Sequence, residues 1–508
     1  MSADPEVIVI GAGPNGLFAA CRLARAGLGV RVLEASPHPG GALWDLPTTE
    51  PGFHHDVGAG FIAFRDSEAF SGLELESHGL RWALAPIESA HPALDGSCAV
   101  ISRDLELSAA TFGGAADGEA WRRLQRLHTR IEPQLMQLLG PLPQISPALR
   151  MGPLQGLRLA SCFARSSAGL ARHLFTSEAA RRVIPAMGLH VDVGPHDRFG
   201  AGIAYVLAMR ASTSGYAIPV GGAGAITRAL LAELEAHGGE LQLNARVEAV
   251  RVAEGRAVGV TLADGQQLDA SGCVLANTSA PSLYLGLLSP EHVPSRIVAS
   301  MRRFPQGWGT FKIDFALDGP VPWSAEPARR AAVVHVGESL QDLDRFTQQV
   351  RAGHLPEQPY LVIGQHTLAD PSRAPRGKHT LYVYTHAPSV LDEARYPGGW
   401  AIWREHLADV IKDRIEWLAP GFAQLVRRRA ISDPCDLERS NANLIGGDLG
   451  GGSNQWWRQL IFRPVFPYFR YRTPVSRLYL GSSYTHPGAG VHGMCGWNAA
   501  GMALRDLA

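Results

Sequence analysis

The chain has 508 residues, of which 46% are hydrophobic and 19% are charged, and its 47 basic residues equal its 47 acidic residues in number. This composition is typical of a globular protein and excludes a disordered chain, a coiled coil and a collagen-like repeat. The neutral balance also argues against a nucleic-acid-binding protein. The six cysteines stand singly, so we expect neither a zinc site nor a dithiol redox site.

The N-terminus carries no cationic leader followed by a long apolar core, and no uninterrupted apolar run reaches the length of about 18 residues that a bilayer requires. We therefore expect no signal peptide and no transmembrane helix. Few, dispersed cysteines suit a reducing compartment. The sequence predicts a cytoplasmic protein.

The first 34 residues follow the pattern of a dinucleotide-binding unit. An apolar run at 6–10 predicts a buried parallel strand, and the glycine-rich segment 11–16 opens a helix that ends near Gly27. A second strand, 30–33, ends at Glu34. The glycines would let the backbone approach a pyrophosphate at the helix N-terminus, and Glu34 would accept the ribose hydroxyls while disfavouring NADP. Because strand, glycines, helix and acid stand in order, we predict a dinucleotide site.

The next segment indicates which dinucleotide binds. Gly40-Gly41-Ala42 follows the acid shortly, and a second glycine-containing stretch occupies 55–60. Here the chain resembles the flavin-dependent amine oxidase and phytoene desaturase superfamily, with most likeness to bacterial phytoene dehydrogenase-like proteins. The resemblance implies non-covalent FAD, with the glycine pair making a second pyrophosphate contact. Ala42 stands where this superfamily usually has arginine.

The middle of the chain continues the same pattern. Residues 219–224 open a helix that Gly238-Gly239 closes, and the apolar runs 241–243, 247–252, 257–262 and 273–276 predict a β-meander. The resemblance implies that the backbone of Val247 meets the adenine, although a core position explains Val247 equally well. The stretch at 222–224 lacks a third glycine, because position 227 is Thr. We therefore expect no separate NADPH domain, and reoxidation by oxygen, a quinone or another carrier.

The C-terminus supplies a third segment, in which an apolar strand at 478–480 leads into the glycine-containing stretch 481–493 and a helix of small residues. The N–H groups at such a helix start would face the negative charge of a reduced flavin. The stretch resembles the closing motif of the superfamily. The expected cofactor-binding residues are Gly11, Gly13, Pro14, Asn15, Gly16, Glu34, Ala35, Gly40, Gly41, Ala42, Val247, Gly481, Ser482, Gly488, Gly490 and Val491.

The predicted fold class is α/β. A Rossmann-type FAD-binding domain, a parallel sheet with a β-meander, would be interleaved with an α+β substrate-binding domain. The FAD-binding domain is expected at 1–65, 215–285 and 470–508, and the substrate-binding domain at 66–214 and 286–469. No metal-ligand cluster is evident in the sequence.

Four features of the expected substrate domain are candidates for function. Lys312 lies on an alternating strand, where the resemblance implies a catalytic lysine near flavin N5, and where a strand-edge lysine is the alternative. The acid-free, arginine-containing stretch 150–175 could rest on anionic lipid, but its arginines could equally be solvated or paired, which is more common. The aromatic segment 456–469 could line a substrate tunnel or be core. The glycines of 446–453 suggest a flexible loop, and we interpret the histidines beside the cofactor motifs as structural residues.

The leading functional hypothesis is an FAD-dependent desaturase or dehydrogenase that transfers a hydride from an apolar, isoprenoid- or carotenoid-like substrate to flavin N5. One alternative is a flavin-dependent amine oxidase that releases hydrogen peroxide, although Val491-His492 occupies the place of an expected aromatic cage residue. A second alternative is a flavin-bearing regulatory protein without turnover, since a fold does not prove a reaction.

Overall fold

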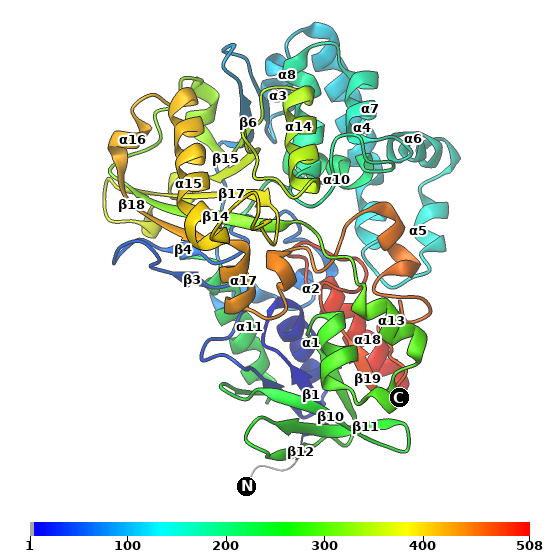
Figure 1. Ribbon diagram of the computed structural model, residues 1–508. Coiled ribbons are helices and arrows are strands. Elements are labelled where there is room, and N and C mark those ends of the chain that lie inside the picture. Colours follow the sequence, from blue (N-terminus) through cyan, green and yellow to red (C-terminus); the bar gives the residue numbers. More distant parts are fainter. Residues whose placement is uncertain (1–4) are drawn as a thin grey trace.

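In the computed structural model, which describes residues 5–508, five parallel strands form one of two large sheets (Figure 1). The strands are short apolar runs, almost all buried, as expected where both faces of a parallel sheet are covered. They are β1 (Val7–Ile10), β2 (Val30–Leu33), β9 (Glu240–Gln242), β13 (Cys273–Ala276) and β19 (Leu478–Leu480). The order β19-β13-β1-β2-β9 brings together strands from both ends and the middle of the chain.

Alternate residues of β1 point to opposite faces of this sheet. Val7 and Val9 pack against three helices, whereas Ile8 and Ile10 pack against a small antiparallel sheet. The helices are α1 (Pro14–Arg25), α11 (Gly224–Ala236) and α18 (Met494–Leu507). The antiparallel strands are β10 (Val247–Ala253), β11 (Arg256–Leu262) and β12 (Gln267–Asp269).

The predicted β-meander is therefore confirmed only in its central part. Strands β10, β11 and β12 pair in sequence order, but β9 pairs in parallel with β2, and β13 pairs in parallel with β1. The reason is that β10, β11 and β12 form the connection between two strands of the main sheet, β9 and β13, and sequence alternation does not show which sheet a strand joins.

The second large sheet has seven strands and lies above the parallel sheet in Figure 1. It comprises β6 (Ile87–Pro92), β7 (Cys98–Ile101), β14 (Gly309–Leu317), β15 (Ala331–Val336), β16 (Leu361–Gly364), β17 (His379–Ala387) and β18 (Val426–Ser432). The order is β18-β14-β17-β16-β15-β6-β7. On one face, Phe311 and Ile313 of β14 pack in a core with Ile411 and Ile415 of α15 (Gly399–Leu418). The opposite face turns toward a layer of helices.

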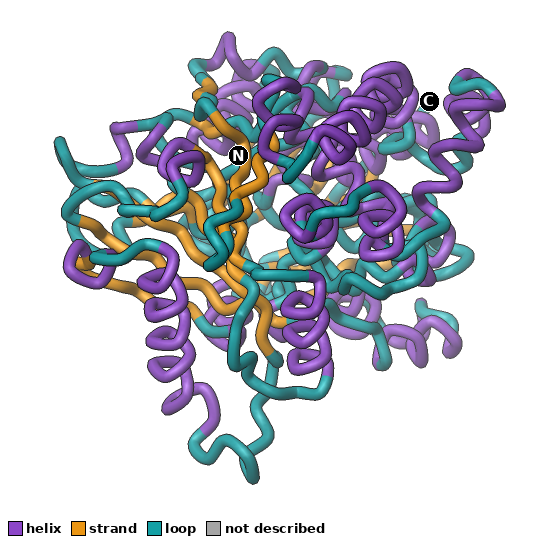
Figure 2. The backbone as a smooth tube through the Cα atoms, turned by 90° about the horizontal axis from the view of Figure 1, so that it is seen from above, coloured by secondary structure: helices purple, strands orange, loops and turns teal. Residues whose placement is uncertain are grey.

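These helices surround the strands, which run as a central band when the molecule is seen from above (Figure 2). Their core is the largest apolar cluster described, and it joins the sheet to α4, α7, α9 and α10. The helices of this layer are α3 (Leu105–Thr111), α4 (Ala115–Gln137), α5 (Ile145–Arg150), α6 (Pro153–Phe163), α7 (Ser167–Leu174), α8 (Glu178–Arg181), α9 (Val183–Gly188), α10 (Ala201–Thr213) and α14 (Leu340–Arg351).

Short elements complete the structure. Two small ribbons pair β3 (Asp45–Leu46) with β4 (His55–Asp56) and β5 (Trp82–Ala83) with β8 (Ile218–Pro219). The short helices include α2 (Glu68–Ser71), α12 (Ala280–Ser282), α13 (Ser295–Arg302), α16 (Phe422–Leu425) and α17 (Pro434–Ser440). Over residues 5–508, no helix has the length and apolarity needed to cross a bilayer. The predicted fold class is confirmed; the predicted domain boundaries stay a prediction.

Candidate functional site

The glycine-rich loop between β1 and α1 forms a cradle at the carboxyl end of the parallel sheet. Gly11 has a φ of +92°, which favours glycine, and a methyl group on Gly16 would lie 2.1 Å from the carbonyl oxygen of Gly11. Pro14 begins α1, where a missing N–H costs nothing. The side-chain Oδ1 of Asn15 is buried without a partner in the described part of the chain. The free N–H groups of this helix N-terminus fit a phosphate-bearing ligand, whereas Oδ1 of Asn15, which only accepts, fits an N–H or O–H donor of such a ligand.

Glu34 lies directly beside this cradle, at the end of β2. One carboxylate oxygen accepts a hydrogen bond from the N–H of Ala12 at 2.7 Å, and the other accepts from the N–H of Ser36 at 2.9 Å, so Ala35 and its neighbours turn around it. Glu34 is partly exposed. The carboxylate is thus fixed in place while part of it stays accessible, as ribose binding would require.

The predicted second glycine pair folds back onto the first loop. The N–H of Gly40 donates to the carbonyl of Ala12 at 2.8 Å, and a methyl group on Gly41 would lie 3.2 Å from Cα of Gly13. Ala42 follows within the same turn. These segments, separated by about thirty residues in sequence, therefore form one surface, as P-loop-like nests of backbone N–H groups do.

The segment between β9 and β10 contacts the residues at the end of β2, where Glu34 lies. The N–H of Ala245 donates to the carbonyl of Glu34 at 2.8 Å, and the N–H of Asn244 donates to the carbonyl of Ser36. Val247 begins β10 and is 9% exposed within the core that includes Leu33. The side chain of Val247 is therefore part of the core, and the contact of its backbone with adenine stays a prediction.

The C-terminal segment meets the first loop through two helix N-termini. A methyl group on Gly496, in the first turn of α18, would lie 1.7 Å from the carbonyl oxygen of Asn15, so α18 and α1 begin side by side. The Nδ1 of His492 accepts the N–H of Met494 and thereby caps α18. Burial lowers the pKa of His492 to about 4, which keeps this nitrogen free to accept. Two helix dipoles thus point their positive ends at one region.

The remaining predicted residues of this segment lie around that junction. Gly481 donates its N–H to the carbonyl of Ala276, and Ser482 is buried beside it. Gly488 and Gly490 have φ values of +101° and +119°, and Val491 packs against the core that contains α1. The structure therefore brings the three predicted cofactor segments together.

The glycine-containing segment 446–454 is not the flexible loop that its composition suggests. Asp448, which is buried, accepts the N–H groups of Gly307, Gly450 and Gly452 at 2.7–2.8 Å. The buried guanidinium of Arg463 donates to the carbonyls of Gly450, Gly451, Ser453 and Ser483. The flexibility prediction is wrong because the glycines serve close hydrogen bonding to side chains far away in sequence, and Arg463 joins this segment to the C-terminal motif.

One face of the seven-stranded sheet is polar and turns away from α15. Lys312 lies opposite Tyr384 in the β14–β17 pairing, and opposite residues share a face. The pairing of the neighbouring strands extends this polar face across the sheet. Its polar and aromatic members are Ser89, His91, Thr310, Lys312, Asp314, His335, Tyr382, Tyr384 and His386.

Lys312 is buried in the sheet interior, because β14 pairs on both sides, so the strand-edge alternative is wrong. Its Nζ lies 2.5 Å from both carboxylate oxygens of Asp314 and 4.8 Å from the ring centre of Tyr382. Asp314 also accepts from the hydroxyl of Thr48 and lies 3.7 Å from Nδ1 of His55 on β4. The ion pair therefore joins the seven-stranded sheet to the segment that follows the cofactor cradle. The catalytic role of Lys312 stays a prediction.

A second buried ion network lies beside the first, and sequence reasoning missed it. Arg373 donates to Asp56 at 2.8 Å, to Asp370 at 2.9 Å and to the carbonyl of Pro219 at 3.1 Å. Burial alone would raise the pKa of Asp56, but Arg373 and its other partners hold that pKa below the ordinary value. Asp56 and Arg373 are 317 residues apart, so no local pattern could reveal the pair.

The same carboxylates occupy the N-terminal end of α11. Asp56 accepts the N–H of Ala223 at 2.7 Å, and Asp45 accepts the N–H of Gly224 at 3.1 Å. A phosphate could not approach two carboxylates placed there. The structure thus supports the expectation that the Gly222–Gly224 stretch is not a second nucleotide site.

A chain of hydrogen bonds between tyrosine and histidine side chains crosses the polar face. The hydroxyl of Tyr384 lies 3.0 Å from Nδ1 of His190, and Nε2 of His190 lies 2.8 Å from Nε2 of His335, whose ring in turn contacts that of His91. Burial lowers the pKa of His190 to about 4 and that of His91 to about 3. His190 and Tyr384 are nevertheless partly exposed, whereas His335 and His91 are buried. A neutral imidazole behind an accessible hydroxyl can accept a proton.

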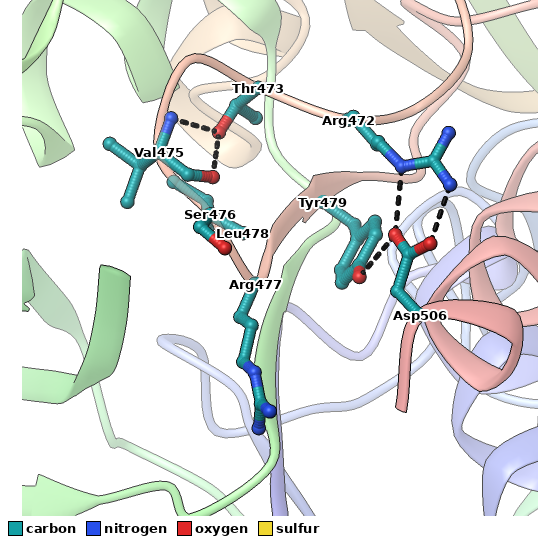
Figure 3. Close-up of a pocket in the computed structure, with 8 residues that line it drawn as sticks. All are labelled: Arg472, Thr473, Val475, Ser476, Arg477, Leu478, Tyr479 and Asp506. Atoms are coloured by element: carbon teal, nitrogen blue, oxygen red, sulfur yellow. Dashed lines mark hydrogen bonds and ion pairs between the residues drawn. The ribbon is translucent and has the colours of Figure 1, made fainter. Parts of the chain in front are cut away.

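A surface cavity of about 370 Å³ lies elsewhere, at the start of β19 (Figure 3). Arg472 and Tyr479 both bond Asp506 across it. It opens at the amino end of the parallel strands, whereas ligands of such sheets bind at the carboxyl ends. We therefore interpret it as structural. No metal-binding cluster of acids, histidines or cysteines occurs in the described range.

Comparison with known proteins agrees with this geometry. The profile of the flavin-containing amine oxidoreductase family matches residues 15–395. The chain is 29% identical to mouse (Mus musculus) pyridine nucleotide-disulfide oxidoreductase domain-containing protein 2, over 100% of this chain and 94% of that protein. It is 28% identical to the lycopene-forming phytoene desaturase of Pseudescherichia vulneris, over 96% of each chain.

Among solved structures, an oxidoreductase from Methanosarcina mazei superimposes with a TM-score of 0.64 at 18% identity, over 98% of this chain and 99% of that one. At that identity the likeness shows the fold. The family match, the phytoene desaturase relative and the cradle formed by three distant segments lead to one conclusion: the chain belongs to the flavin-containing amine oxidoreductase family and is a flavin-dependent oxidoreductase.

Proposed function

We propose that this protein is an FAD-dependent desaturase or dehydrogenase that takes a hydride from an apolar substrate of isoprenoid or carotenoid type. Gly11, Gly13 and Asn15 would hold the pyrophosphate, Glu34 the ribose, and the N-terminus of α18 the pyrimidine end of the flavin. When bound, the flavin supplies the hydride acceptor. Retention would be non-covalent, because the buried thiol of Cys495 in this segment has its pKa raised to about 11 and donates to backbone carbonyls.

The observation that carries the proposal is the apolar cluster beside the polar sheet face. Partly buried side chains of Phe61, Trp308 and Tyr384 pack against the same cluster as Cys162 and Phe163 of α6. We infer that an apolar substrate would lie against these partly buried side chains, between the sheet and the helical layer. Burying such a molecule there is favourable at about 25 cal/mol per Å² of apolar surface.

The charges around this face disfavour a cationic amine. The two carboxylates there, Asp314 and Asp56, are each paired with a buried cation, Lys312 and Arg373. An ammonium group would have to compete with these pairs, and an unpaired charge is costly to bury. His492 is buried and caps α18, so it does not supply the missing half of an aromatic cage.

Forming a carbon–carbon double bond requires loss of a hydride from one carbon and a proton from its neighbour. A bound flavin would supply the acceptor for the hydride, and oxygen, a quinone or another carrier would then take up the electrons. We assign the proton to the hydroxyl of Tyr384, which passes its own proton to Nδ1 of His190 at 3.0 Å. Burial keeps His190 neutral, which leaves its Nδ1 lone pair free. Because burial also disfavours the imidazolium, His190 would relay the proton and not hold it.

An anaerobic screen tests the proposal directly. Purified protein is mixed with polyenes and isoprenoids in detergent or with amines, and the oxidised-flavin absorbance is followed. Bleaching by an apolar compound supports the proposal. Bleaching by amines alone, with hydrogen peroxide release in air, would instead establish an amine oxidase.

A further inference from the structure

One surface of the molecule is unusually apolar, and several aromatic residues of the segment 456–469 lie on it. The core reading is wrong for Trp456, Trp457, Phe462 and Phe466, which are 44–59% exposed, and the tunnel reading stays a prediction. Most of the exposed large apolar side chains described in the structure belong to this segment, to α5 and α6, or to Phe199 between them. We call these the apolar surface: Ile145, Leu149, Leu154, Leu157, Phe199, Trp456, Trp457, Leu460, Ile461, Phe462 and Phe466.

Side-chain contacts connect the parts of the apolar surface. The ring of Phe199 contacts that of Trp456 at 5.1 Å between centroids. Phe163, at the end of α6, lies 3.5 Å from the position that a methyl group on Gly202 would take, close to Phe199 in the chain. Figure 1 shows α5 and α6 standing out from one side of the molecule. The surface is therefore one region built from distant segments.

The apolar side chains point outward because of helical spacing. Ile145 and Leu149 are four residues apart on α5 and are 65% and 75% exposed, and Leu154 and Leu157 are three apart on α6 and are 55% and 69% exposed. Residues at these spacings share a helix face. Leu460 is 55% exposed with a φ of +58°, a conformation that leucine rarely adopts, and no buried contact explains it. Such a face is unusual on a monomer exposed to water.

The charges that the two main segments of the apolar surface contribute are all positive, and Asp197, near Phe199, is already paired with Arg351. The segments 133–177 and 449–505 contain no aspartate or glutamate. The arginines on or beside this surface form no ion pairs within residues 5–508, and Arg458 and Arg470 instead lie over the rings of Trp457 and Phe469. The unpaired cations are Arg150, Arg158, Arg165, Arg172, Arg458 and Arg470.

We propose that the apolar surface docks this protein on an anionic lipid bilayer, with its leucines and aromatics in the headgroup–acyl boundary and its arginines on lipid phosphates. Short helices with exposed apolar faces, interfacial tryptophans and arginines without acids are the pattern of a peripheral membrane surface. An acidic protein partner would match the arginines but not an apolar face of this extent. A second copy of the chain would place the unpaired arginines against one another. The proposal stands on this surface alone and does not depend on the substrate of the flavin site.

Vesicle flotation with the flavin-loaded protein tests it. We expect the protein to float with vesicles containing about 30 mol% phosphatidylglycerol, and to float several-fold less with pure phosphatidylcholine or in high salt. The double variant Leu149→Glu/Leu157→Glu should lose at least about tenfold in partition, because two charges would enter the apolar boundary. The double variant Arg150→Gln/Arg158→Gln should lose about fivefold for each cation removed.

Matched controls use equally exposed side chains on other faces. Val390 and Ile402 are 80% and 63% exposed, and the double variant Val390→Glu/Ile402→Glu should float like the unmodified protein. The double variant Arg345→Gln/Arg376→Gln is the corresponding charge control. Flavin absorbance and circular dichroism establish that each variant is folded. Failure of the unmodified protein to float, or equal losses in the test and control variants, would overturn the proposal. So would concentration-dependent dimers that Leu149→Glu/Leu157→Glu dissociates while vesicles bind neither form.

Discussion

Arg373 offers the sharpest test of how the two sheets are held together. Its guanidinium is 1% exposed and joins Asp56 on β4, Asp370 and the carbonyl of Pro219. Replacing it with methionine keeps much of the volume but leaves two buried carboxylates without their cation. Removing one partner of a buried ion pair costs about 3–5 kcal/mol, which is a large fraction of the roughly 5–15 kcal/mol that stabilises a typical protein.

The pH dependence of this loss identifies its cause. In the unmodified protein the pKa of Asp56 lies below its ordinary value of 3.8, so the carboxylate contributes stability at neutral pH that is lost only as pH falls through that range. Without Arg373, burial dominates and raises this pKa above 3.8. The variant then loses stability as pH rises. The loss starts as pH rises through about 3.8, so we expect the destabilisation by Arg373→Met to be at least about 1 kcal/mol smaller at pH 4 than at pH 7.

Urea unfolding at both pH values measures the effect, with Arg376→Met as an exposed control three residues away. The control should change the free energy of unfolding by less than about 0.5 kcal/mol. A loss below about 1 kcal/mol for Arg373→Met, or one that is the same at both pH values, would refute the reasoning, because a buried carboxylate cannot lose its cation without either penalty.

Three further predictions follow from the site. Glu34→Gln should weaken flavin binding at least about tenfold in a fluorescence titration, because the amide accepts only one of the two backbone N–H groups that the carboxylate now binds. Tyr384→Phe should slow anaerobic bleaching by an identified substrate about 100-fold without changing flavin affinity; an unchanged rate would remove Tyr384 from the proton path. The thermal midpoint should fall steeply below pH 6.5, because buried histidines with pKa values near 3–4 must take up protons on unfolding, each costing about 1.4 kcal/mol at roughly pH 5.5; a midpoint constant from pH 7 to 5 would contradict this. These histidines are His55, His91, His190, His366, His386, His486 and His492.

The cofactor side of the molecule was predictable because its chemistry constrains local sequence. The tight turn requires glycine at position 11, and close packing requires glycine at position 16. Both requirements are local, so the sequence alone reveals them. The same holds for the central strands β1 and β13, which are apolar and buried throughout because both faces are covered. The sequence did not predict the pairing partners of β9 and β13, because pairing depends on which strand edge is free in the assembled sheet.

The polar sheet face was not predictable, because its members are held by partners that are distant in sequence. Lys312 was found only through its local strand context, whereas Arg373, His190 and Tyr384 lie in unremarkable sequence. A histidine or arginine becomes informative only when its surroundings are known to be buried, since burial makes an unpaired charge costly and so dictates a partner. Three-dimensional structure is thus required to separate a structural ion network from a proton path on this face.

For the apolar surface, the absence of acidic residues was a more informative sequence signal than the aromatic residues. Aromatic residues at 456–469 were compatible with core, tunnel or surface, because a side chain's apolarity does not say what covers it. The lack of acids over 133–177 and 449–505 is a different kind of signal. The partly exposed Arg429 pairs with Glu405 and Asp409, whereas the buried Arg463, within an acid-free segment, donates to backbone carbonyls. Unpaired cations among exposed leucines therefore indicate a neighbour outside the chain that carries both negative charge and apolar surface, and a lipid bilayer has both.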